Sequence, residues 1–230
     1  MELTPRLRVI ADLVPYGAAF ADIGTDHAYL PTWLLLNGVI CSAVAADINR
    51  GPLERARETA KKYAVEEHME FRLCDGLTGI QESEANVIAI AGMGGDTIAH
   101  ILEQAPWTGK PDILLLLQPM TSQSDLREWL FRSGYCIEKE CYAREGEKLY
   151  TILCVRSGRM NNFSQAELWA GRQNNEPLRG AHLDHVANKV KKMLGGHRSA
   201  SCPDEGRIGH LEEVLSELYA MKEEWEAWQR

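Results

Sequence analysis

The amino-acid sequence predicts an α/β fold with a mostly parallel seven-stranded sheet, followed by a small C-terminal all-α domain. Three observations carry this prediction. Short apolar stretches alternate with helical ones between residues 18 and 133, which is the pattern of βαβ units. The last two apolar stretches follow each other without a helix between them. Beyond residue 158 the periodicity is helical throughout.

The apolar stretches locate the strands, and the amphipathic stretches between them locate the helices. The predicted strands are 18–23, 40–46, 69–73, 86–91, 112–117, 134–141 and 148–156. The predicted helices of this domain are 3–14, 28–37, 51–64, 94–105 and 122–133. Because only a turn containing Gly146 separates the last two strands, they should form an antiparallel hairpin at the sheet edge.

A turn-rich segment, 157–162, separates the two predicted domains, which we place at 1–158 and 159–230. In the second domain, apolar residues recur at spacings of three and four over 183–194 and again over 211–228. Two such stripes joined by a short loop predict an antiparallel helical hairpin of coiled-coil type. Gly195-Gly196 is expected to end the first helix.

Composition limits the class of protein. Hydrophobic residues make up 45% of the chain and charged residues 25%, as in ordinary globular domains. No apolar run approaches the roughly 20 residues that span a bilayer, and the N-terminus has no signal-peptide core. We therefore expect a cytoplasmic protein. The six cysteines form no Cys-x-x-Cys pair, which favours reduced thiols over a metal site or disulfides.

Charge is distributed unevenly. The net charge of −8 argues against a nucleic-acid partner, but 159–202 carries seven Lys and Arg residues against three acids. Local charge decides docking more than the total does. The candidate contacts to a nucleic-acid backbone are Lys189, Lys191, Lys192 and Arg198, with an ordinary solvated surface as the alternative.

The strongest chemical signal is the segment Asp22-Ile-Gly-Thr-Asp-His-Ala, where a buried strand ends and a helix begins. Gly24 permits a tight turn and close approach of a ligand, and the helix start presents free N–H groups. The residues expected to bind a cofactor here are Asp22, Gly24, Thr25, Asp26 and His27.

Acids also follow the next two predicted strands. Asp47 can accept the two hydroxyls of a ribose, and Asp75 can bond an adenine amino group. Ile48 and Leu77 are expected to flank the adenine ring, with Gly76 beside them. Since ligands of open α/β sheets bind at the carboxyl ends of the strands, the three acids together predict a nucleoside cofactor.

The loop also indicates which nucleoside cofactor binds. A dinucleotide loop needs glycines where this chain has Asp26 and Ala28. An acid disfavours a pyrophosphate but attracts an ammonium or sulfonium group. The sequence therefore favours S-adenosylmethionine, and it opposes the alternative of an NAD-dependent oxidoreductase.

The methyl acceptor is expected beside the ends of the fourth and fifth strands. Gly92 and Met93 should border the cofactor, and Met93 and Gly94 the acceptor, although a tight turn alone explains these glycines equally well. At the fifth strand Gln118, next to Pro119, can contact a base edge or cap the following helix.

Other side chains near this edge are candidates for holding a nucleotide. Arg6 and Arg8 can bind phosphates or belong to a solvated helix face. Tyr29 and Trp33 can stack on an extruded base, although core packing is the stronger interpretation for Trp33.

Segments 22–31, 91–95 and 117–119, together with the helical tail, resemble the bacterial tRNA (adenine(22)-N1)-methyltransferase family, TrmK, over essentially the whole chain. The resemblance implies a class I Rossmann-like methyltransferase domain with a C-terminal coiled-coil domain. It also implies S-adenosylmethionine as cofactor, tRNA as partner, and methylation of adenine N1 at tRNA position 22.

Several functional alternatives remain open at the level of sequence. Asp26 either orients the base and stabilises its developing charge, as a catalytic residue, or only holds the cofactor's amino end. The chain is alternatively a methyltransferase for another RNA site or a small molecule, or a non-catalytic RNA-binding protein. Trp225 and Trp228 make a weak dimer an alternative to a monomer.

Overall fold

The computed structural model describes all 230 residues. The chain divides into two compact units, Met1–Met160 and Asn161–Arg230, which we describe separately. None of the helices combines the length and apolar character needed to cross a membrane.

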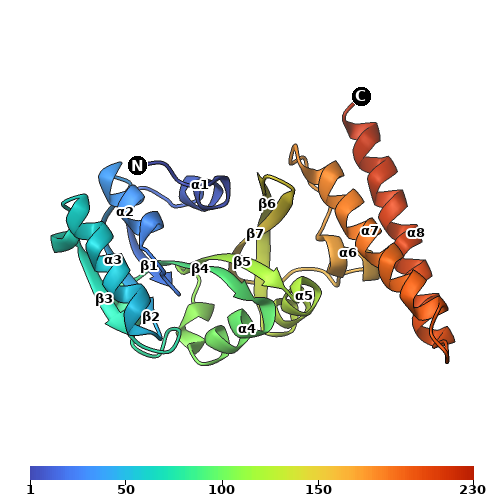
Figure 1. The fold of residues 1–230 in the computed structure, drawn as a ribbon, viewed down its shortest axis with the longest axis horizontal. Coiled ribbons are helices and arrows are strands. Elements are labelled where there is room, and N and C mark those ends of the chain that lie inside the picture. Colours follow the sequence, from blue (N-terminus) through green and yellow to red (C-terminus); the bar gives the residue numbers. More distant parts are fainter. The chain divides into compact units, whose positions relative to one another are not determined.

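The first unit is built on one seven-stranded sheet with strand order β3-β2-β1-β4-β5-β7-β6 (Figure 1). The strands are β1 (Ala18–Ile23), β2 (Ile40–Asp47), β3 (Met69–Leu73), β4 (Val87–Gly94), β5 (Leu114–Thr121), β6 (Tyr135–Glu145) and β7 (Lys148–Ser157). Strands β1 to β5 pair in parallel, whereas β7 pairs antiparallel with both β5 and β6. The predicted mostly parallel sheet with an edge hairpin is confirmed.

Helices cover both faces of this sheet, and short 3₁₀ turns complete the connections. The helices are α1 (Pro5–Asp12), α2 (Tyr29–Leu36), α3 (Arg50–Lys62), α4 (Gly95–Glu103) and α5 (Gln123–Arg132). Helices α1, α2 and α3 share one apolar core with the sheet, and α4 and α5 share the other. Because side chains alternate along a strand, Phe20 enters the first core and Ala21 the second.

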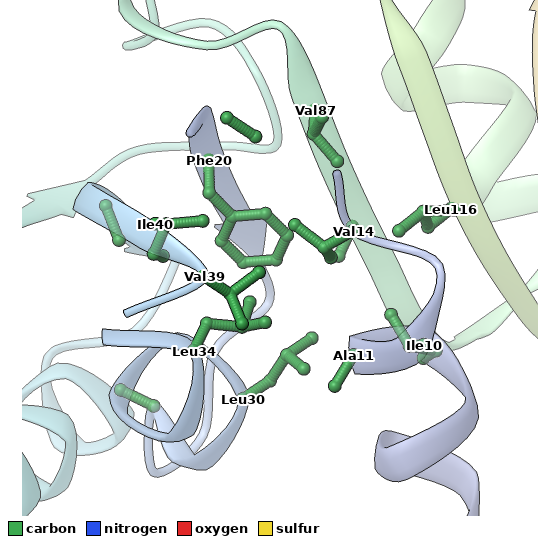
Figure 2. Packing of buried hydrophobic residues seen from close by; sticks show 14 of the residues in the cluster. Ile10, Ala11, Val14, Phe20, Leu30, Leu34, Val39, Ile40, Val87 and Leu116 are labelled. Carbon is green, nitrogen blue, oxygen red and sulfur yellow. The ribbon is translucent and has the colours of Figure 1, made fainter. Parts of the chain in front are cut away.

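The first core shows why the sheet and its helices hold together. The Phe20 ring lies among side chains from α1, α2 and the neighbouring strands, including Ile10, Leu34, Ile40 and Val87 (Figure 2). All of these side chains are buried. Burial of each large apolar side chain contributes about 1.5–3 kcal/mol, so this cluster fixes α1 and α2 against the sheet.

The edge hairpin is longer than expected. Strand β6 extends to Glu145, whereas the apolar pattern ended at residue 141. The additional segment is paired with β7, and the Glu145 carboxylate accepts a hydrogen bond from the backbone N–H of Arg6 at 2.9 Å. The hairpin therefore anchors the start of α1, a contact between distant parts of the chain that local periodicity does not report.

The second unit consists of α6 (Gln165–Ala170), α7 (Arg179–Arg198) and α8 (Glu205–Trp228). Ion pairs Asp184–Lys222 and Arg198–Glu212 show that α7 and α8 run antiparallel, as predicted. The short helix α6 was not predicted. It begins with a capping box between Ser164 and Glu167.

The prediction that Gly195-Gly196 ends the first tail helix is wrong, because α7 continues to Arg198. Each interior glycine costs a helix about 1 kcal/mol relative to alanine. Leu194 just before the glycines and Ile208 on α8 are buried in the shared core of the unit. This packing outweighs the propensity of the two glycines.

The two long helices carry opposite charge. Helix α7 contains five Lys and Arg residues and one Asp, whereas α8 contains two basic residues and seven Glu residues. The close packing of the helices is helped at one point by Gly180, where a Cβ atom would overlap the Trp225 ring. Trp225 therefore packs inside this unit, whereas Trp228 at the end of α8 is 59% exposed.

Candidate functional site

The three predicted acids lie at the carboxyl edge of adjacent strands. Asp22 is near the end of β1, Asp47 ends β2, and Asp75 follows β3. In the strand order, β1, β2 and β3 are direct neighbours, and Asp47 pairs with Leu73 across β2 and β3. The structure therefore brings together the acids that the sequence selected.

The loop between β1 and α2 is tied to the neighbouring strand. The backbone N–H groups of Gly24 and Thr25 both donate to the carbonyl oxygen of Ala46 on β2, at 2.8 and 3.0 Å. Gly24 has φ of 76°, a conformation that favours glycine, and Ala28 adopts φ of 50° at the start of α2. The end of β2 thus fixes Gly24 and Thr25, the first part of the loop.

A pocket of about 400 Å³ opens beside this loop. Its volume lies in the range typical of small-molecule sites, roughly 300–1,000 Å³. It is lined by Thr4, Arg6, Leu7, Asp22, Gly24, Thr25, Asp26, His27, Ala28, Tyr29, Leu30, Ala91 and Gly92. Residues from α1, the β1–α2 loop and the end of β4 therefore form a single hollow.

Asp22 is the buried acid of this pocket. Removal from water raises the pKa of its carboxyl from 3.8 to about 6, although Thr25 and the Arg6 guanidinium lower it and Asp47 raises it. A cationic group bound in the pocket would favour the ionised carboxylate. Asp22 is therefore suited to hold an ammonium or sulfonium group.

Asp26 differs from Asp22 because its side chain is exposed and already paired. Its Oδ1 accepts hydrogen bonds from Nε and Nη2 of Arg55 on α3, the first at 3.1 Å. Its Oδ2 lies 3.5 Å from Nε2 of His27, whose ring stacks on Tyr29 with centroids 5.0 Å apart. The sequence did not indicate Arg55, since the contact joins residues 29 positions apart.

At the carboxyl ends of β2 and β3, apolar side chains beside Asp47 are exposed to solvent. Ile48 and Leu73 are 60% and 49% exposed, unusual values for such apolar side chains, and they border the two acids of this edge. Leu77, by contrast, is buried in the core under α4, so its side chain does not reach the open edge where Leu73 lies. The available signal for Leu73 was its position at the last residue of β3.

The other residues predicted at this edge are Asp47, Asp75 and Gly76. Oδ1 of Asp47 accepts from the backbone N–H of Asn49 at 2.7 Å, and Asp75 is exposed. Gly76 has φ of 52°, and a Cβ atom there would press on Ile101. Gly76 therefore serves the turn after β3, next to Asp75.

Gln118 occupies a fully buried position between β4 and β5. Its Oε1 accepts from Nη1 of Arg6 at 2.7 Å and from the backbone N–H of Gly92 at 3.1 Å. Its Nε2 donates to the carbonyl oxygen of Pro119 at 3.1 Å. Since both ends of the amide are engaged, Gln118 supports Arg6 and the Gly92 loop, and neither of the predicted alternatives, a base contact or a helix cap, describes it.

The two predicted arginines of α1 separate. The guanidinium of Arg6 lies in the pocket, 5.5 Å from the centroid of the Tyr150 ring, and its Nε is buried without a hydrogen-bond partner. Arg8 instead pairs with Asp12 and lies over the Trp33 ring at 4.9 Å. Only Arg6 belongs to the pocket.

Met93 connects the glycine loop of β4 to the β1–α2 loop. A Cβ atom at Gly24 would overlap the Cε methyl of Met93, so the two residues are in direct contact. Gly94, the last residue of β4, faces the Thr121 hydroxyl at the end of β5. Tyr29, at the other side of the pocket, is 45% exposed, as a stacking residue requires.

The predicted basic quartet is exposed on α7 of the second unit, Asn161–Arg230. Lys189 lies over the Trp169 ring and Lys191 over the Tyr219 ring, at 5.8 and 5.1 Å. Arg198 pairs with Glu212 of α8. No group of three or more His, Cys, Asp or Glu side chains is arranged to hold a metal ion.

Comparison with known proteins identifies similar methyltransferases. A family model described as a methyltransferase domain matches residues 3–153. The tRNA (adenine(22)-N(1))-methyltransferase of Bacillus subtilis is 41% identical over 160 residues, covering 69% of this chain and 66% of that protein. The aligned segment therefore spans slightly less than two thirds of the length of that relative.

Solved structures extend the similarity over both units. The crystal structure of the B. subtilis m1A22 tRNA methyltransferase TrmK matches with a TM-score of 0.80 and 30% identity, covering 97% of this chain and 99% of that one. A putative tRNA (m1A22) methyltransferase of Streptococcus pneumoniae, in complex with S-adenosyl-L-methionine, gives 0.79 and 33%, covering 93% and 100%. The predicted fold class is thus confirmed.

Proposed function

This chain belongs to the TrmK family of methyltransferases, and from that membership we propose that it methylates N1 of the adenine at position 22 of tRNA. The single observation that carries the proposal is the alignment of Asp22, Asp47 and Asp75 at the carboxyl ends of three adjacent strands around the Gly24 loop. That arrangement suits an adenosyl cofactor with a cationic end.

The residues present fit S-adenosylmethionine along its length. Asp47 is placed to accept the ribose hydroxyls, and Asp75 to accept from the adenine amino group. The exposed Ile48 and Leu73 offer apolar contacts for the faces of the ring. Asp22, buried in the pocket, is suited to the cationic methionine end. When bound, the cofactor supplies a sulfonium-activated methyl group.

The pocket beside the Gly24 loop receives the target base. Extrusion of a base from folded RNA costs a few kcal/mol, and stacking on Tyr29 would recover part of it. Arg6, fixed by Gln118 and facing Tyr150, still has a buried Nε that can donate to an acceptor atom of the nucleotide. Gly92 leaves room beside Arg6 because it carries no side chain, and a Cβ atom there would lie 3.3 Å from Nη1 of Arg6.

The chemistry asks little of a general base. Adenine N1 has an in-plane lone pair that would attack the sulfonium-bound methyl carbon directly. The electrons of the broken carbon–sulfur bond would stay on sulfur, and the methylated base would be a cation. Holding the two reactants in line supplies most of the rate effect, on the order of 7–11 kcal/mol at best. The carboxylate of Asp22 lines the pocket and favours the positive charge of the methylated base.

Docking of the tRNA is assigned to the basic helix α7 as well as to the pocket. Lys189, Lys191, Lys192 and Arg198 would contact phosphates and release counterions. This surface fixes where the RNA lies without reading its sequence. Because tRNA is the proposed substrate, we propose that the protein acts in the cytoplasm, as a monomer or a weak dimer.

The test is incubation of the protein with labelled S-adenosylmethionine and an unmodified tRNA transcript, followed by primer-extension mapping. We expect a stop at position 22 and no label in a transcript with guanine at that position. Label at another nucleotide would assign a different RNA site to the enzyme. Cofactor binding without transfer to any tRNA would overturn the enzymatic proposal.

A further inference from the structure

We propose that Arg55 is a positioning residue for the cofactor, acting through Asp26. In this arrangement α3 holds the β1–α2 loop, Gly24–Ala28, in its binding conformation. The inference rests on the proposed function, because it concerns the same cofactor site. Asp26, expected either to orient the base or to hold the cofactor's amino end, becomes in this proposal the loop's point of attachment.

The contact is made by two donors of one guanidinium. Nε and Nη2 of Arg55 both point at Oδ1 of Asp26, and Oδ2 is left to His27. His27 in turn stacks on Tyr29 with ring planes 4° apart. Arg55 is therefore the first member of a chain of contacts that runs through the loop to Tyr29 on α2.

Arg55 stands on a rigid base. Helix α3 begins at Arg50, three residues after Asp47, and Leu53 and Ala56 on either side of Arg55 are buried in the core. The Arg55–Asp26 contact thus joins the segment expected to hold the ribose to the segment expected to hold the methionine end. The distance between these two segments decides how well an extended cofactor fits.

The loop needs such an attachment for two reasons. Ala28 adopts φ of 50°, a left-handed conformation that a residue with a Cβ atom takes up at a cost. The loop also brings the Asp26 carboxylate into the same pocket as that of Asp22. The guanidinium of Arg55 occupies the Asp26 carboxylate and leaves Asp22 to face the cofactor's cationic end.

The same helix offers a matched control. Arg57, two residues further along, is also exposed, but its guanidinium lies over the Phe71 ring at 4.4 Å. Replacing Arg57 removes the same charge from α3 without touching the loop. An effect that depends on the Asp26 contact should therefore appear in Arg55→Ala and not in Arg57→Ala.

The experiment measures binding of S-adenosylhomocysteine by titration calorimetry, and KM and kcat with tRNA. Because the pair is exposed, we expect Arg55→Ala to weaken binding and raise the cofactor KM about three- to fivefold, with kcat unchanged at saturation. Arg55→Lys should recover part of the affinity, and Arg57→Ala should match the wild type. The Arg55→Ala effect should shrink at high salt.

A double-mutant cycle sharpens the outcome. If the two residues act through each other, Arg55→Ala combined with Asp26→Asn should bind no more weakly than Arg55→Ala alone. Wild-type affinity in Arg55→Ala, an equal loss in Arg57→Ala, or a fall in kcat with KM intact would each overturn the inference. Normal binding of S-adenosylhomocysteine without methylation of tRNA would instead overturn the proposed function. If the wild-type protein did not bind S-adenosylhomocysteine at all, both proposals would be overturned.

Discussion

Asp22 has a carboxyl group in a pocket from which the protein largely excludes water. With the pKa raised from 3.8 to about 6, the folded protein binds a proton there more tightly than the unfolded chain does. This group therefore favours the ligand-free fold below pH 3.8, and that contribution is lost as the pH rises through about 6. A bound cation reverses the preference, because it needs the ionised carboxylate.

The affinity for the cofactor product should therefore depend on pH. Since a carboxyl with a pKa of about 6 is mostly protonated at pH 5, affinity for S-adenosylhomocysteine should fall about tenfold from pH 7 to pH 5. Asp22→Asn should bind more weakly at pH 7 and show a flat profile over this range. Calorimetric titrations at several pH values measure both. An unchanged slope in Asp22→Asn would assign the proton to another group.

Gly24 has less room for a side chain than Gly17, which has a similar backbone conformation. Gly24→Ala must accommodate both φ of 76° and an overlap with Met93, whereas Gly17→Ala has the same φ and open space around the new methyl. Gly17→Ala should lose about 1–2 kcal/mol of stability and keep full cofactor affinity. Gly24→Ala should lose more stability and also bind S-adenosylhomocysteine poorly, as thermal unfolding and calorimetry will show. Equal behaviour of the two variants would contradict the Met93 contact.

At the scale of the element, one buried ion pair joins α5 to the edge hairpin. Arg127 and Glu140 are both buried, and the guanidinium donates to both carboxylate oxygens, at 3.1 and 2.8 Å. Arg127→Met should destabilise the protein by about 3–5 kcal/mol in urea unfolding, because it leaves a buried carboxylate without its cation. Arg127→Met with Glu140→Leu should recover most of the loss. A double variant as unstable as the single one would show that the pair itself stabilises the fold.

The elements also show what a sequence can and cannot predict. Strands β1 to β5 were predictable because each is a local apolar run bounded by turns, and the three acids because each ends such a run. The end of β6, helix α6 and the passage of α7 through Gly195-Gly196 were not, since long-range packing decides them. Arg55 was missed for the same reason, because only the fold brings it beside the loop, whereas Leu73 could have been selected as the last residue of its strand.

For the whole molecule, our proposal assigns the cofactor to the first unit and tRNA phosphates to helix α7 of the second. Reversal of the four basic residues of α7 to glutamate should weaken tRNA binding and lower the salt dependence by about one unit of slope per lost phosphate contact. Affinity for S-adenosylhomocysteine should stay at the wild-type value, because every residue that we propose for the cofactor site belongs to Met1–Met160. Filter binding at several salt concentrations measures the slope. Unchanged affinity and slope would remove α7 from the interface.

The opposite charges of α7 and α8 have one more consequence. Two parallel lines of unlike charge, held together by a common core, make the second unit an electric dipole across its short dimension. A polyanion exerts a torque on such a dipole at a distance, turning one flank toward it and the other away before any contact forms. The unit would thus approach RNA already oriented. Added salt screens this field, so it would lower the association rate more than it raises the dissociation rate.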